Sequence, residues 1–393
     1  MERSRRHVAF LVMFLLSCTS EAGTPASSLA SGKDAGQTAS GKGVGQTTSG
    51  KAQAGTPSAD EGLEIKKELE AQGLALARDK AGRWYLGTRQ DGKLLLSKPF
   101  GDQEKRVDLV YEQPRQQTVL TVVSESELAT RTGHELIRTT YSLDVEFREG
   151  AFRVERWTSR QDTKDLLDGT PDKFTEQMVD FVGKTVTKNS SGNSPPDVKA
   201  PLLVAGNSFD EQLAFRDFVP VYGAKNLKDD SDLSVQLMMR WDAEKIHFKL
   251  KVRDDFVLFG KDIHTDHVEL WGLPKGGGQH LVYFYENEEI WLVSAESPAS
   301  KHQLRGEYML MLDGYEVKFE IPYFLHMTSG SFKGEEFVGG TIVISDTDRD
   351  GKQETLIATS ALKPKSSWTW GKIFLRGKSD LPELSAETVV GLY

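Results

Sequence analysis

The sequence predicts a mainly β protein: a C-terminal antiparallel β-sandwich or jelly roll, preceded by a small α+β domain and a disordered tether. Three observations support this fold class. Apolar and polar residues alternate along most of the chain after residue 60, with the period of half-buried strands. Helical spacing of apolar residues is confined to two segments before residue 188. Residues 19–59 contain almost nothing apolar and cannot build a core.

The N-terminus has the features of a lipoprotein signal peptide. Three arginines among the first six residues precede an apolar run, residues 8–16, which is too short to span a bilayer. Ser17 and Cys18 follow this run and resemble the lipobox of bacterial lipoproteins. The resemblance implies that residues 1–18 are a signal peptide, that Cys18 carries a lipid such as palmitate, and that this lipid anchors the protein in the bacterial outer membrane, on its periplasmic or its outer side. The alternative is an ordinary secretory signal with an incidental cysteine.

Residues 19–59 form the predicted tether. They are rich in Gly, Ser, Thr and Lys, and a nine-residue repeat begins at Ser31 and again at Ser40. Cys18 is the only cysteine, so the chain forms no internal disulfide bond and offers no thiol for catalysis. The formal charge of −9 at pH 7 argues against nucleic acid as a partner and against electrostatic attachment to anionic lipids. Contact with the membrane is therefore expected through the lipid alone.

Residues 60–188 are predicted to form the small α+β domain. A first helix is indicated by the capping-box spacing of Ser58 and Glu61 and by an apolar stripe that ends near Asp79. Two strand pairs follow, each with a turn that ends in glycine. A second helix is indicated from Thr170, where a Thr-Pro pair supplies the cap and the first position. The pattern assigns no function to this domain.

The rest of the chain divides into three predicted parts. Residues 189–201, rich in Ser, Asn and Pro, are a linker; residues 202–378 are the β-sandwich; residues 379–393 are a short tail that docks on a partner or on the protein itself. From Val235 to Val252 apolar residues alternate on both sides of a charged turn, the pattern of an antiparallel hairpin. Further short strands follow without intervening helices, as in two-sheet sandwiches and jelly rolls.

Five blocks of the second domain, taken in order, carry a resemblance to a known family. They read RWDAEKIHFKLKVRDDF, TDHVELWGLP, DGYEVKFEIPYFL, SDTDRDGKQETLIATS and WTWGKIFL. Together they resemble the family-9 carbohydrate-binding modules and the wider DOMON-like group of β-sandwiches, over residues 198–378. The resemblance implies a β-sandwich in which a pair of tryptophans holds a terminal sugar and no catalysis takes place. The family's opening segment usually has a tryptophan where this chain has Phe215.

Sugar binding requires flat aromatic side chains for the apolar faces of pyranose rings and planar polar groups for their hydroxyls. The predicted carbohydrate-binding residues are Trp368, Trp370, Trp271, Trp291, Tyr285 and Gln353. Trp368 and Trp370 point to the same side if their segment is extended. The alternative for each tryptophan is a place in the core, and packing is the favoured interpretation of Trp271 and Trp291.

An aspartate-rich loop predicts a structural calcium site. Asp346, Asp348 and Asp350 stand on alternate residues, so a tight loop can turn their oxygens toward one hard cation. Ile357 occupies the position where an EF-hand loop has its last glutamate, which excludes an EF-hand. Glu354 or a backbone carbonyl would complete the predicted site. The alternative is an Asp-rich, solvated turn without metal.

Three functions remain open at this point. The first is a membrane-tethered lipoprotein that binds polysaccharide of the envelope or of its surroundings through the sandwich. The second is a structural or assembly lipoprotein that uses the sandwich for contacts with envelope proteins. The third is an electron carrier, because some DOMON-like sandwiches hold haem between a methionine and a histidine; no redox cofactor is expected, since Met309 and Met311 alternate within a strand like core residues.

Catalysis is not expected. The sequence has no nucleophile elbow, no HExxH motif and no ordered Ser-His-Asp set. Carboxylate pairs such as Asp254-Asp255 are adjacent, so in a strand they point to opposite faces and cannot form the pair that a glycosidase needs. The chain is therefore predicted to bind its partner without transforming it.

Overall fold

The computed structural model describes residues 62–390 apart from short gaps. The gaps are residues 92, 102–104, 130–133, 167–172, 194, 210–211, 228–231, 274–277, 286, 327–330, 333, 348–351 and 364–365. All described residues belong to one compact unit, Gly55–Tyr393. The predicted signal peptide, Cys18 and the tether lie outside the described residues and stay predictions.

The prediction of a mainly β protein is confirmed. The first part of the chain forms a four-stranded sheet, order β1-β2-β3-β4, and a seven-stranded sheet, order β11-β10-β9-β8-β7-β6-β5. The strands of the first sheet are β1 (Glu64–Leu69), β2 (Leu74–Arg78), β3 (Trp84–Gln90) and β4 (Lys93–Leu96). Those of the second are β5 (Arg106–Glu112), β6 (Gln117–Ala129), β7 (His134–Arg148), β8 (Ala151–Asp165), β9 (Lys173–Asp180), β10 (Thr185–Ser190) and β11 (Val198–Pro201).

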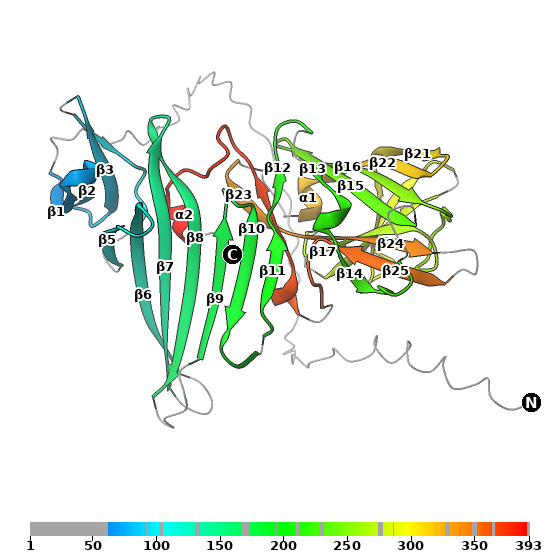
Figure 1. Ribbon diagram of the computed structural model, residues 1–393, viewed down its shortest axis with the longest axis horizontal. Helices are drawn as coiled ribbons and strands as arrows, with labels where there is room; N and C mark the ends of the chain where they lie inside the picture. The colour runs from blue at the N-terminus through cyan, green and yellow to red at the C-terminus, as the bar shows by residue number, and fades with distance from the viewer. Residues whose placement is uncertain are drawn as a thin grey trace, which may run out of the picture. The chain divides into compact units, whose positions relative to one another are not determined.

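The seven-stranded sheet of this part is an up-and-down meander, in which each strand pairs with its neighbours in the chain (Figure 1). The predicted turn at Glu149-Gly150 is confirmed, because both residues have positive φ, 54° and 75°, and join the long hairpin β7–β8. Alternate residues of these strands enter one apolar cluster, which includes Leu120, Leu143 and Trp157. The alternation of apolar and polar residues in the sequence therefore correctly predicts which side chains of these strands are buried.

Both helices predicted for residues 60–188 are wrong. The first segment holds β1 and β2, which pair with each other around Gly73, a residue with φ of 62°. The second holds β9, which pairs with β8 and β10. Strand pairing on both sides of β2 and β9 overrides their local helical spacing. Within the described residues this part of the chain has only β-strands and short 3-10 helices, at Glu70–Gln72 and Ser191–Asn193.

The second part of the chain is the predicted antiparallel sandwich. A five-stranded sheet has the order β13-β15-β16-β22-β21, and a seven-stranded sheet has the order β14-β25-β24-β17-β18-β19-β20. The strands of the five-stranded sheet are β13 (Gln212–Leu213), β15 (Leu233–Trp241), β16 (Lys245–Asp254), β21 (Gly306–Met311) and β22 (Gly314–Pro322). Those of the other are β14 (Val219–Tyr222), β17 (His267–Trp271), β18 (Gln279–Phe284), β19 (Ile290–Ser294), β20 (Lys301–Leu304), β24 (Thr341–Thr347) and β25 (Gln353–Ala358).

The remaining elements of the described residues are short. A three-stranded sheet has the order β12-β26-β23, with β12 (Leu203–Ala205) parallel to β26 (Lys372–Leu375) and β23 (Glu336–Gly339) antiparallel to it. The helical segments are α1 (Tyr323–His326), α2 (Ala386–Val390) and 3-10 helices at Phe215–Asp217 and Ser367–Thr369. None of the helices in the described part of the chain is long and apolar enough to cross a membrane.

The core of the sandwich lies between the five-stranded and the seven-stranded sheet. On β16 the inward residues are Ile246, Phe248, Leu250 and Val252, each fully buried. Phe248 stacks on its cross-strand neighbour Phe319, with ring centroids 4.9 Å apart. The predicted hairpin β15–β16 forms with Trp241 opposite Ile246 and Leu233 opposite Asp254. The side chain of Asp254 therefore lies on the same side of β16 as these core residues.

The predicted linker and tail are both integrated into the fold. Val198–Pro201, inside the predicted linker, pairs with β10 as strand β11. In the predicted tail Leu384 and Val389 are fully buried in the cluster of the first part, and the Val389 carbonyl accepts a hydrogen bond from the Trp157 indole at 3.2 Å. The tail thus docks on the protein itself, because its apolar residues complete a core that the meander leaves uncovered.

Candidate metal centre and aromatic face

Three aspartates from three strands meet at one end of the sandwich core. Asp254 is the last residue of β16, Asp266 directly precedes β17, and Asp346 lies within β24. Each continues the inward phase of its strand, since Val252, Val268 and Ile344, two residues away along the chain, are core residues. Side-chain alternation therefore carries all three carboxylates between the two sheets.

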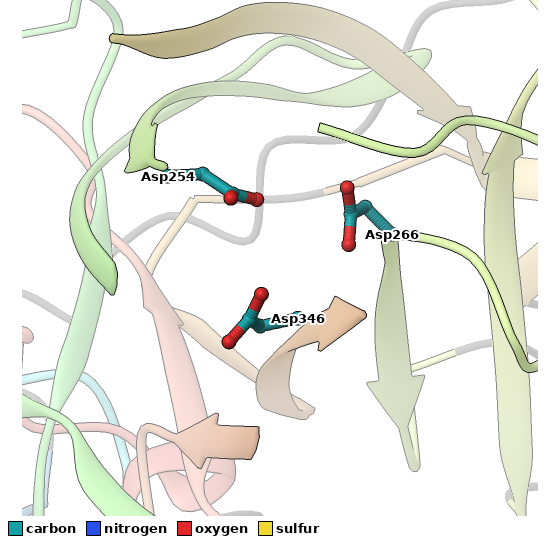
Figure 2. A group of neighbouring side chains, drawn as sticks. All are labelled: Asp254, Asp266 and Asp346. Atoms are coloured by element: carbon teal, nitrogen blue, oxygen red, sulfur yellow. The ribbon is translucent and has the colours of Figure 1, made fainter. Parts of the chain in front are cut away.

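The carboxylates of Asp254, Asp266 and Asp346 face a common space (Figure 2). One carboxylate oxygen from each lies within 4.8 Å of the others. The exposed fractions of the three residues are 3%, 0% and 5%. Three carboxylates this close and this dry repel one another, so the group needs protons or a cation to be stable.

Backbone N–H groups fix the orientation of two of these carboxylates. Asp266 accepts from the Leu258 N–H at 2.5 Å and from the Thr347 N–H at 2.8 Å. Asp254 accepts from the Phe256 N–H at 2.8 Å. The residues that follow β16 and those that flank β17 and β24 are thereby tied to the acidic group, which gives its oxygens a defined geometry.

Burial is the main cause of an unusual ionisation at Asp266. Burial first, and the negative charge of Asp254 next, raise the pKa of Asp266 to about 9 from an ordinary 3.8, with a smaller contribution from Asp346. The hydrogen bonds from Leu258 and Thr347 act in the opposite direction. Without a cation, Asp266 therefore holds a proton at neutral pH.

Two buried hydroxyl groups accompany the carboxylates. Tyr315 is fully buried on β22, and its hydroxyl has no hydrogen-bond partner among the described residues. Burial and the charges of Asp266, Asp254 and Asp346 raise the pKa of Tyr315, which shows that its hydroxyl lies in their field. Thr355 stands opposite Asp346 in the β24–β25 pairing, and its buried hydroxyl has no partner among the described residues. An unsatisfied buried hydroxyl is costly, so a bound ion or its water would satisfy a need already present.

The donor set fits a calcium ion. Calcium binds about six to eight oxygen ligands at about 2.3–2.6 Å, so two ligands of one ion can lie up to about 5 Å apart. The 4.8 Å spread of the three carboxylates meets this condition. The group consists of oxygen donors, which suits a hard cation and not the nitrogen and sulfur preferences of zinc or copper. Three negative charges would also hold a divalent ion strongly.

The structure places the predicted calcium ligands as follows. Asp346 belongs to the centre, while Asp348 and Asp350 lie outside the described residues. Glu354 sits at an irregularity in the β24–β25 pairing and is not part of the carboxylate group found among the described residues. Sequence reasoning missed Asp254 and Asp266. The sequence signal for each was an acidic residue at a strand position whose alternate neighbours are core residues.

Trp271 and Trp370 form a packed pair at the outer face of the seven-stranded sheet of the sandwich. Their ring centroids are 6.1 Å apart at 57°, and both pack against Val343 and Ala358. Gly272 permits this contact, because a Cβ at that residue would lie 2.6 Å from the Trp370 ring. The two rings touch each other, so they leave no slot between them for a sugar.

Tyr285 and Trp291 form a second aromatic pair and are half-buried. Their ring centroids are 6.3 Å apart at 32°. The Trp291 indole donates to the Glu289 carboxylate at 3.0 Å, and the Lys301 ammonium lies 5.1 Å from the Trp291 ring. Two aromatic faces, a carboxylate and an ammonium therefore share one partly open surface.

The hairpin turn that carries Tyr285 is well fixed. The Tyr285 N–H donates to the Glu289 carbonyl at 2.9 Å, and the Tyr285 carbonyl accepts from the Glu288 N–H at 3.0 Å and from the Tyr308 hydroxyl. Glu288 adopts a φ of 64° to close the turn. These hydrogen bonds connect Tyr285, on one side of the aromatic pair, to Glu288, Glu289 and Tyr308.

The other two predicted sugar-binding residues have partners within the protein. The Trp368 indole donates to the Pro196 carbonyl at 2.9 Å, and the Lys188 ammonium lies 5.6 Å from its ring. Gln353 donates to the Ser345 hydroxyl at 3.0 Å. Trp368 thus links the sandwich to the segment before β11, and Gln353 links β25 to β24.

Comparison with known proteins gives a likeness of structure only. No protein-family model and no curated protein matches the chain. A family 9 carbohydrate-binding module from Caldicellulosiruptor kristjanssonii in complex with cellotriose is 14% identical, with a TM-score of 0.30, over 45% of this chain and 95% of that one. The same kind of module in complex with glucose is 15% identical, with a TM-score of 0.29, over 45% and 97%.

A third solved structure, a proposed carbohydrate-binding protein from Bacteroides uniformis, is 14% identical, with a TM-score of 0.31, over 42% of this chain and 86% of that one. Two of these three solved structures are family 9 carbohydrate-binding modules, the family that the sequence resembles. Their identities and TM-scores are low, so the site rests on the residues of this chain.

Proposed function

We propose that the protein is a non-catalytic carbohydrate-binding lipoprotein that holds a saccharide on Tyr285 and Trp291. The observation that supports this proposal is the half-exposed pair of rings beside the Glu289 carboxylate and the Lys301 ammonium. Aromatic faces bind the apolar face of a pyranose, while the charged groups hydrogen-bond its hydroxyls. Both are present together at the β18–β19 hairpin.

The aspartate centre supports this surface through neighbouring strands. In the proposal it holds a structural calcium ion on Asp254, Asp266 and Asp346. His267, the residue after Asp266, pairs with Tyr283 on β18, two residues before Tyr285. A cation that fixes the start of β17 would therefore also fix the end of β18. Chelation is accordingly expected to weaken saccharide binding as well as stability.

The test of saccharide binding is a Trp291→Ala variant of the full chain, titrated with oligosaccharides by calorimetry. Loss of a central aromatic contact is expected to weaken binding about tenfold or more. Tyr222→Ala is the matched control, since Tyr222 is an exposed aromatic residue on β14, at the opposite edge of the same sheet. Equal affinities of the Trp291→Ala variant and the unaltered protein would refute the proposed surface.

The lipoprotein part of the proposal rests on Ser17 and Cys18. Lipid on Cys18 would hold the protein on the outer membrane, and residues 19–59 would give the folded part reach. A Cys18→Ser variant is expected to leave the membrane fraction and to lose incorporation of labelled palmitate. A variant that stays in that fraction and still incorporates the label would contradict lipidation at Cys18.

A further inference from the structure

The five-stranded sheet of the sandwich carries a pocket of about 260 Å³ on its outer face, away from the aromatic pair. Its polar lining comes mainly from one row of side chains across the sheet. Arg240 on β15 stands opposite His247 on β16, and His247 stands opposite Glu320 on β22. Phe209 closes one end of the row, and Arg305 also lines the pocket.

The row is an ordered network. Arg240 lies over the Phe209 ring at 5.4 Å and donates from Nη2 to His247 Nδ1 at 3.2 Å. The His247 Nε2 lies 2.7 Å from the Asp242 carboxylate. The same His247 Nδ1 lies 3.3 Å from the Glu320 carboxylate.

Positive charge is left over in this pocket. Glu320 is paired with the Lys245 ammonium at 2.7 Å, and Lys318 is paired with Glu307 at 2.8 Å. Arg240 and Arg305, by contrast, have no carboxylate partner among the described residues. The Arg305 carbonyl accepts from the Glu320 N–H at 3.0 Å, which holds the backbone of Arg305 against the row. Arg240 and Arg305, whose charges no carboxylate among the described residues matches, thus both line one small pocket.

We propose that this pocket is a second binding site, specific for the carboxylate-bearing ring of an acidic saccharide, the chemistry of a uronic acid. Arg240 and Arg305 bind the carboxylate, because a guanidinium matches a carboxylate with two parallel hydrogen bonds. Phe209 covers the apolar face of the ring, and Glu320 accepts from its hydroxyls. The volume suits one sugar ring and no larger ligand. The site lies on the other sheet from Tyr285 and Trp291 and does not depend on them.

The test is a titration of the full chain with glucuronate, with glucose as the neutral counterpart. Glucuronate is expected to bind, and to bind more weakly as the salt concentration rises. Arg305→Gln is expected to weaken glucuronate binding about tenfold, because a charge-assisted bidentate contact is lost. Arg305 is exposed, so this variant should fold. Arg253→Gln is the control, since Arg253 is an exposed arginine on β16 that does not line the pocket.

The Arg240→Lys variant gives a second measurement, because lysine keeps the positive charge but cannot form two parallel hydrogen bonds to a carboxylate. Weaker glucuronate binding in this variant supports the proposed geometry. Unchanged glucuronate affinity in both arginine variants, or no glucuronate binding at all, overturns the proposal. Inorganic phosphate or acetate binding as tightly as glucuronate also overturns it, since the pocket would then recognise charge without the ring. Trp291→Ala should leave glucuronate binding unchanged, so the two proposed sites can fail separately.

Discussion

Calcium is expected to raise the melting temperature of the protein by several degrees, and excess chelator is expected to remove the gain. A ligand that binds only the folded state at 100 times its dissociation constant adds about 2.7 kcal/mol to the free energy of unfolding. The buried group Asp254, Asp266 and Asp346 gives this effect a structural cause, because a cation replaces mutual repulsion with attraction. Differential scanning calorimetry with and without calcium measures it.

Asp254→Asn is the variant that tests the centre with least damage. The asparagine side chain keeps an oxygen that can accept from the Phe256 N–H, now at 2.8 Å from Asp254, and exchanges the other oxygen and the negative charge for a neutral NH2 donor. We expect the calcium-dependent rise in melting temperature to disappear, while the metal-free variant melts no lower than the metal-free unaltered protein. Asp255→Asn is the control, because Asp255 is exposed on the opposite phase of the chain. A full calcium response in the Asp254→Asn variant would show that the ion binds elsewhere.

The pH dependence of this stabilisation follows from Asp266. Its pKa in the folded, metal-free protein is about 9, against 3.8 ordinarily, so the folded state keeps a proton that the unfolded chain has released. The metal-free protein therefore loses stability as pH rises from about 4 to about 9, on the order of 4 kcal/mol by pH 7. Calcium displaces this proton, so the calcium-dependent gain should grow with pH over the same interval. A gain that stays constant between pH 5 and pH 9 would contradict the assignment.

The sandwich and part of its site were open to prediction because alternation is a local signal. Ile246, Phe248 and Val252 stand in one phase, and the same phase reaches Asp254. An aspartate in the core phase at the end of a strand therefore indicates a buried carboxylate. That three such residues meet was not predictable from spacing, because β16, β17 and β24 are brought together by pairing and sheet packing. The sequence loop of alternating aspartates pointed to only one member, Asp346.

The first part of the chain shows where local sequence patterns did not predict the structure. Leu74 and Leu76 fit a helical stripe, yet they also alternate with Ala75 and Ala77, so the local pattern allows both structures. The choice is made by β1 and β3, which pair with β2 on its two sides. The apolar residues of the tail likewise did not predict where the tail docks, because their docking surface is built by β7 and β8, far away in the sequence. Non-local contacts decide such cases.

The Tyr285–Trp291 pair was predicted as residues and missed as a pair. Trp291 was assigned to packing because a tryptophan in an alternating strand is usually buried. In the structure the strand lies near the edge of its sheet, where only β20 follows, and Trp291 stays half-exposed. Exposure at a given strand position depends on what covers the sheet, and that information lies outside the strand's own sequence.

In the Lys372→Met variant the free energy of unfolding is expected to lose the rise with pH that Lys372 causes in the unaltered protein. Lys372 on β26 is only 6% exposed, and burial, followed by the charge of Lys188, lowers its pKa to about 7 from 10.5. Between these two pH values the unfolded chain carries a proton that the folded protein releases. Stability therefore falls as pH drops from about 10.5 to about 7, by up to about 4 kcal/mol. Methionine keeps most of the apolar stem and removes the ammonium, which lies 5.8 Å from the centroid of the Phe337 ring.

Two neighbouring variants make this prediction specific. Lys188 is also buried, and burial lowers its pKa to about 8, but its ammonium donates to the carbonyls of Trp368 and Trp370 at 2.8 and 2.9 Å. Lys188→Met would leave both carbonyls without this donor, so it should lose stability on that account. Lys199→Met, at an exposed residue of β11, should change little. Chemical denaturation between pH 6 and pH 10 tests this: the stability of Lys372→Met relative to the unaltered protein must fall as pH rises, and a difference independent of pH would contradict the lowered pKa of Lys372.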